Sequence, residues 1–133
     1  MSIEEQAQLK ANYYNEAIRY MDNAKEVLKK ANKKDEFFQD PKYVKMASGT
    51  AYNAVLLALD GYFLLKDVPK KKGRKDIDYY RMNIAKIDKK LLNYLNESYE
   101  ALHLCGYYDG TKNVNIVKSG FEYAYTIIEK IKP

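Results

Sequence analysis

The sequence predicts an all-α fold, an antiparallel (up-and-down) four-helix bundle. Apolar residues recur every three or four positions in four separate segments, which is the spacing of one face of an α-helix. No segment shows the strict alternation of a strand. The composition, 47% hydrophobic and 31% charged with three prolines and six glycines, is typical of a folded globular protein. At 133 residues we expect a single helical-bundle domain over residues 1–133.

The first helix is expected over residues 3–32. Its apolar stripe consists of Tyr14, Ala17, Met21, Ala24, Leu28 and Ala31. Asn32 tolerates a left-handed backbone conformation, and the lysines beside it suit the carbonyl end of a helix. We therefore expect the helix to end near this asparagine.

The second helix is expected over residues 41–66. Asp40 can cap free backbone N–H groups, and Pro41 fits the first helical position. One face carries small residues that let a neighbouring backbone come close: Val44, Ala47, Ala51, Ala54, Ala58 and Gly61. Larger apolar residues widen the surface, which indicates either a central helix or a surface that binds a partner.

The third and fourth helices are expected over residues 76–104 and 111–131. Asp76 is the expected cap of the third helix, and Cys105 with Gly106 marks its expected end. The fourth helix repeats the three-and-four spacing at Val114, Val117, Phe121, Ala124, Ile128 and Ile131.

A cationic loop is expected between the second and third helices. Its charged residues are Lys70, Lys71, Lys72, Arg74 and Lys75. Such a loop either is solvated or contacts the phosphates of a nucleic acid or nucleotide, with Tyr79 and Tyr80 nearby for stacking. The net charge of +5 favours polyanions only mildly.

Asp60, Glu100 and His103 are the candidates for a polar pocket. Asp60 lies among apolar helix neighbours, so its carboxylate should pair with a tyrosine or a lysine, or contact a ligand. Glu100 and His103 match half of the Glu-x-x-His motif of di-iron bundles, which needs two copies. With one histidine in the chain, we expect no metal site, no cofactor and no catalytic residue.

The cellular location is expected to be the cytoplasm. Cys105 is the only cysteine, so no internal disulfide can form. The N-terminus has acidic residues and no apolar signal segment. The most apolar run, residues 51–65, is too short and too polar to span a bilayer, so we expect no membrane association.

The chain resembles HEPN-like bundles and a small uncharacterised bacterial family of all-α proteins. The resemblance is carried by the small-residue second helix, the aromatic last helix and two local patterns: Tyr14-x-x-Ala17-x-x-Tyr20-Met21-x-x-Ala24 and Ala51-Tyr52-x-Ala54. HEPN ribonucleases carry an arginine four to six residues before a histidine, and here Arg19, Arg74 and Arg81 do not precede His103 in this way. The resemblance thus implies a dimer and a non-catalytic binding role.

We therefore expect an uncharacterised, non-catalytic helical-bundle protein that acts through protein interaction as a homodimer, with a possible partner protein. The alternative is a nucleic-acid- or nucleotide-binding HEPN-like module that uses the basic loop 70–75. An enzyme is the less favoured interpretation, because it would require Asp60, Glu100 or His103 to converge in a concave pocket.

Overall fold

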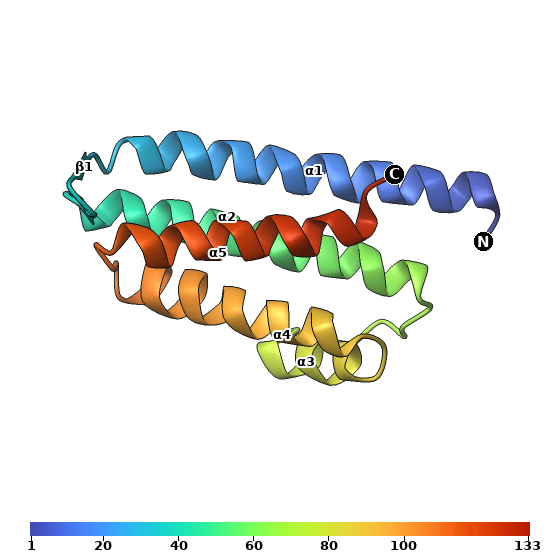
Figure 1. Cartoon of the computed structure of the whole chain (residues 1–133). Coiled ribbons are helices and arrows are strands. Elements are labelled where there is room, and N and C mark those ends of the chain that lie inside the picture. Colours follow the sequence, from blue (N-terminus) through green and yellow to red (C-terminus); the bar gives the residue numbers. More distant parts are fainter.

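The computed structural model describes residues 1–133, most of which are helical (Figure 1). The α-helices are α1 (Ile3–Lys29), α2 (Pro41–Leu65), α3 (Ile77–Ala85), α4 (Lys89–Ser98) and α5 (Val114–Ile128). The smaller elements are strands β1 (Lys33–Lys34) and β2 (Phe37–Phe38), the π-helix η1 (Tyr99–Tyr108) and the 3-10 turn η2 (Glu129–Ile131). The predicted all-α class is confirmed in its broad sense. The small antiparallel sheet formed by β1 and β2 was not predicted.

The long helices lie lengthwise beside one another, and successive ones run in opposite directions (Figure 1). α4 continues directly into η1, so the two form one rod, while the short α3 packs against α4. The β1–β2 hairpin lies at one end of the molecule, and the loop between α2 and α3 lies at the other (Figure 1). None of the helices combines the length and apolarity needed to cross a membrane.

The predicted starts of α1 and α2, at residues 3 and 41, are confirmed, whereas α1 ends at Lys29, three residues before the expected residue 32. Asn32 adopts the expected left-handed conformation (φ 54°) in the turn that follows α1. The Asp40 side chain accepts a hydrogen bond from the Lys42 N–H (3.0 Å), and Pro41 is the first residue of α2. The Asp76 carboxylate likewise accepts from the Tyr79 N–H (2.9 Å) at the start of α3.

The expectation of one helix over residues 76–104 is wrong, because the chain breaks after Ala85. The Asp88 carboxylate accepts a hydrogen bond from the Leu91 N–H (3.1 Å) and pairs with the Lys130 amino group (3.2 Å). The Leu91 N–H and this lysine hold the pKa of Asp88 below its usual value. The Asp88 carboxylate thus caps the start of a new helix, α4, at a point where the apolar spacing of the sequence predicted that one helix would continue.

The expected stop at Cys105 and Gly106 is also wrong. The chain continues through both residues as the π-helix η1, whose last turn includes a hydrogen bond from the Asp109 N–H to the Leu104 carbonyl (3.0 Å). Gly110, with φ 62°, supplies the left-handed residue that reverses the chain. α5 then begins at residue 114 rather than 111, capped by the Asn113 side chain.

α2 is the central helix of the fold. α1, α5 and η1 all pack against it, and its buried residues come from several sides of the helix. The fully buried members are Val44, Ala47, Ser48, Ala51, Ala54 and Val55. Packing within the chain therefore accounts for the broad apolar surface of this helix without a partner.

Small side chains on α2 determine how closely α1 can approach. An added Cβ on Gly61 would lie 2.7 Å from Cγ and 2.8 Å from Cβ of Tyr13. These atoms are near the α1 backbone, so Tyr13 could not simply rotate away from a larger residue. Gly61 is therefore required by the contact between the two helices.

Replacing Gly61 by valine should lower the free energy of unfolding by about 1–3 kcal/mol, the usual effect of overpacking. Urea unfolding followed by circular dichroism measures this change. Asn53→Ala, an exposed position on the same helix, is the control and should change stability by less than about 0.5 kcal/mol. Equal stability of the Gly61→Val and wild-type proteins would contradict the packing described here.

Candidate functional site

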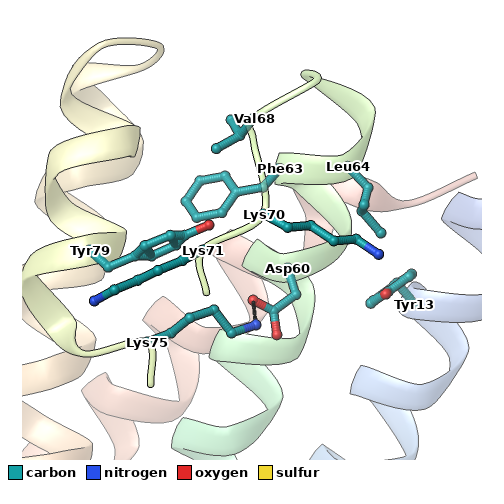
Figure 2. Close-up of a pocket in the computed structure, with 9 residues that line it drawn as sticks. All are labelled: Tyr13, Asp60, Phe63, Leu64, Val68, Lys70, Lys71, Lys75 and Tyr79. Carbon is teal, nitrogen blue, oxygen red and sulfur yellow. Dashed lines mark hydrogen bonds and ion pairs between the residues drawn. The ribbon is translucent and has the colours of Figure 1, made fainter. Parts of the chain in front are cut away.

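A cavity of about 320 Å³ lies where the end of α2, the following loop and α1 meet (Figure 2). It is lined by Tyr13, Asp60, Phe63, Leu64, Val68, Lys70, Lys71, Lys75 and Tyr79. Three of the five cationic residues predicted for the loop therefore face one cavity. Its volume is near the lower end of the range found for small-molecule sites.

Asp60 is the only carboxylate in this cavity, and both of its partners come from outside α2. One of its oxygens accepts hydrogen bonds from the Lys75 amino group and from the Tyr80 hydroxyl, each at 2.9 Å. Burial and the nearby Asp60 raise the pKa of Tyr80 far above its usual value, so this phenol stays protonated as a donor. The prediction that Asp60 pairs with a tyrosine or a lysine is confirmed, and its charge is offset within the chain.

The other cationic residues of the loop have no ion-pair partner. Lys71 extends alongside the Tyr79 ring, with its amino group 5.8 Å from the ring centroid, and Lys70 reaches across the cavity toward Tyr13 (Figure 2). Lys70, Lys71, Lys72 and Arg74 make no ion pair, and Gly73 lies in open space between them. The loop therefore presents four cations that are in no ion pair within the chain.

Asp76 follows the loop directly and offsets part of its positive charge. Its carboxylate accepts a hydrogen bond from the Tyr79 N–H at 2.9 Å, and this bond together with the nearby Lys71 and Arg74 holds the pKa of Asp76 below its usual value. The carboxylate thus caps the start of α3 and makes no ion pair with the loop. The Tyr80 ring is buried and packs against Phe63, so it offers little surface on which a base could stack.

A second cavity of about 250 Å³ adjoins the first, and Lys75 lines both. It is lined by Tyr52, Leu56, Arg74, Lys75, Asp76, Ile77, Tyr80, Tyr99 and His103. Arg74 and Lys75 contribute positive charge and Asp76 contributes one carboxylate, while Tyr99 and His103 of η1 contribute aromatic rings. We call this cavity the aromatic slot.

The aromatic rings of η1 form a row that ends at this slot. The Tyr99 and His103 ring centroids are 5.1 Å apart with an interplanar angle of 26°, and those of His103 and Tyr107 are 5.7 Å apart at 11°. The Arg81 guanidinium lies 4.9 Å from the Tyr99 ring centroid. Burial among these rings lowers the pKa of His103, so its imidazole is neutral at pH 7.

Glu100 lies away from both cavities. It lines a separate surface depression together with Cys105, Asn115 and Tyr123, between η1 and α5. Asp60, Glu100 and His103 thus line three different cavities, and the structure does not bring them together. No cluster of three or more His, Cys, Asp or Glu side chains is placed to hold a metal ion.

Sequence reasoning did not find the aromatic row or the contribution of Tyr13 to the cationic cavity. A signal for the row was present, since Tyr99, His103 and Tyr107 are spaced four residues apart. Nothing comparable marked Tyr13, which reaches the cavity only because α1 packs against the end of α2.

The fold and the site thus define the class of this protein, which is an all-α protein with a cationic cavity beside an aromatic slot. The chain belongs to the family described as a domain of unknown function (DUF5618), whose model matches residues 12–133. It is also similar to a protein of unknown function from Dyadobacter fermentans, with 46% sequence identity and a TM-score of 0.81 over 92% of this chain and 94% of that one. A comparison with curated proteins gave no match. The expectation of an uncharacterised all-α family agrees with these findings.

Proposed function

We propose that the protein is a non-catalytic binding protein for nucleotide units of single-stranded nucleic acid. The observation that carries this proposal is the pair of adjoining cavities that share Lys75, one cationic and one aromatic. A nucleotide has the same two parts, a charged phosphate and a flat base, side by side. Proteins that bind single strands combine a positive groove with aromatic rings in this way.

The phosphates would lie against the loop. Lys70, Lys71 and Arg74 are in no ion pair within the chain, so they can pair with phosphate oxygens without first breaking one. Asp60 would repel a phosphate if it were free, but Lys75 and the Tyr80 hydroxyl offset its charge. Binding through these cations releases counterions from the strand and therefore depends steeply on salt.

The base would enter the aromatic slot. Tyr99 and His103 line this cavity, and its volume of about 250 Å³ leaves room for little more than one ring system and its sugar. Stacking of a base on an aromatic ring contributes about 1–3 kcal/mol to the binding free energy and is available to every base. We therefore propose binding with little sequence preference.

A binding role without catalysis is supported by the separation of the candidate reactive groups. An acid–base pair must lie within hydrogen-bond reach of one reacting atom, whereas Asp60, Glu100 and His103 line different cavities. Burial and the nearby Glu100 raise the pKa of the Cys105 thiol, which disfavours the reactive thiolate.

The finer description of the fold that we propose is an antiparallel four-helix, HEPN-like bundle in which α4 and η1 together form the third of the four rods. The alternating directions of α1, α2, the α4–η1 rod and α5 support it (Figure 1). With no arginine four to six residues before His103, such a bundle would bind without acting as a ribonuclease.

Reversing the charge of two loop lysines tests the phosphate site. The double variant Lys70→Glu/Lys71→Glu should bind a fluorescein-labelled oligouridine about tenfold or more weakly in low salt, and wild-type affinity should fall steeply as NaCl is raised. Fluorescence anisotropy gives both values, and unlabelled uridine monophosphate as competitor separates binding of a strand from binding of a free nucleotide.

The matched control is Lys42→Glu/Lys45→Glu, which makes the same change in net charge at the opposite end of α2. It should keep most of the wild-type affinity. Absent binding, binding that ignores salt, or an equal loss in both double variants would overturn the proposal.

Acidification should tighten binding of the oligouridine through His103. Because burial lowers its pKa, the imidazole is neutral at pH 7 and gains its charge beside Arg74 and Lys75 only as pH falls below its usual value of 6.5. Uracil and phosphodiesters do not titrate in this range. Anisotropy titrations from about pH 7.5 to about pH 5.5 should therefore show a gain in affinity in the wild type that His103→Gln lacks. The same pH dependence in both proteins would exclude this role for the histidine.

Homodimerisation, which the HEPN resemblance implies, remains a separate prediction. Sedimentation velocity of the wild-type protein should show a species of twice the chain mass at micromolar concentration. A single species of chain mass across the micromolar range would contradict it.

A further inference from the structure

A fourth cavity, larger than the three described above, lies at the other end of the molecule, where the β1–β2 hairpin is (Figure 1). Its volume is about 590 Å³, and it runs between the end of α1 and the start of α5. We call it the hairpin groove. The proposed function does not involve it.

The floor of the hairpin groove is apolar and its rim is cationic. Leu28, Phe38, Val114 and Phe121 supply the apolar surface, and both phenylalanines are buried. Four lysines and one asparagine complete the lining: Lys25, Lys29, Lys33, Lys118 and Asn32. No carboxylate is among them, and the lysines stand on both sides of the groove, on α1 and β1 opposite α5.

Backbone hydrogen bonds hold the two walls of the groove together before any ligand binds. The Phe38 N–H donates to the Lys112 carbonyl (2.8 Å), and the Val114 N–H donates to the Glu36 carbonyl (3.1 Å). These bonds fix the hairpin to the start of α5, while the Gln39 N–H donates back to the Ala31 carbonyl (3.1 Å). A groove formed in advance loses little conformational freedom on binding.

Most of the rim charge is available to a partner. Lys29 pairs with Glu26 at 3.0 Å, but both side chains are more than two thirds exposed, so this ion pair contributes little stabilising free energy. The Lys25 amino group lies 4.8 Å from the Tyr125 ring centroid. Lys33 and Lys118 have no ion-pair partner, and they lie on opposite walls.

We propose that the hairpin groove binds an acidic amphipathic helix of a partner protein. Apolar side chains on one face of that helix would fill the floor at Leu28 and Val114, and Asp or Glu residues on its two flanks would pair with the lysines of both walls. The positions of the lysines favour this occupant over a fatty acid, whose single charged end could reach one wall only. The apolar floor also disfavours a nucleic acid, whose phosphates would lie over Phe38 and Phe121.

The test uses a synthetic helical peptide with leucines at positions i, i+3, i+4 and i+7 and glutamates on both flanks. Isothermal titration calorimetry should show saturable binding, and amide chemical shifts of the labelled protein should change at Leu28, Val114 and the hairpin. A peptide with lysine in place of every glutamate should bind at least about tenfold more weakly, because it repels the rim.

The decisive variant is Lys33→Glu/Lys118→Glu, which reverses one charge on each wall and alters only exposed side chains. It should weaken binding of the glutamate peptide at least about tenfold. The matched control Lys70→Glu/Lys71→Glu, at the opposite end of the molecule, should bind the peptide as the wild type does. Circular dichroism verifies that both variants are folded.

Four outcomes would overturn the proposal: no binding of the glutamate peptide, equal binding of the lysine peptide, equal loss in both double variants, or shift changes confined to the 70–75 loop. Binding of laurate in the groove together with failure of the peptide would assign the groove to a lipid and reject a protein partner. Failure of oligouridine binding would leave this test untouched, since the two sites share no residue.

Discussion

The close packing of neighbouring elements against the small residues of α2 is the constraint on which the rest of the structure depends. Ala47, Ala51, Ala54 and Ala58 are essentially inaccessible to solvent, and Gly61 has no room for a Cβ beside Tyr13. Dense packing of this kind gains many weak dispersion contacts but tolerates almost no change of volume. With α1, α5 and η1 held around one rod, the connections between them are forced to the two ends of the molecule.

Both candidate sites follow from that arrangement. At one end, the loop after α2 must cross to α3, and its lysines surround the end of the helix that carries Asp60. At the other end, the hairpin after α1 is fixed to the start of α5, which leaves a groove with an apolar floor. The two ends share an excess of lysine but differ in their neighbours, because aromatic rings adjoin the first and aliphatic and phenylalanine side chains line the second. We therefore assign them different partners.

The sequence was sufficient to predict those features of the fold that depend on residues close together in the chain. The caps at Asp40 and Asp76 and the left-handed Asn32 were predicted, because a side chain that bonds to a backbone N–H two or three residues away leaves a local pattern. The partners of Asp60 were predicted by type, since a carboxylate among apolar neighbours needs a donor. The prediction failed where a local signal competed with a longer pattern. Asp88 was such a cap, but the regular apolar spacing on both sides of it favoured one continuous helix.

The candidate sites were predictable only in part. The cationic loop is a run of adjacent residues and could be found from the sequence, whereas the aromatic slot and the hairpin groove are each formed by segments that lie far apart in the chain.

Hydrogen exchange of the α2 amides tests most directly the central claim, that the other elements pack closely around α2, because this packing should protect its amides on every side. The account predicts that the slowest-exchanging amides in the protein lie between Val44 and Phe63 and exchange only through global unfolding. Exchange of these amides as fast as those in the exposed first turns of α1 would contradict it.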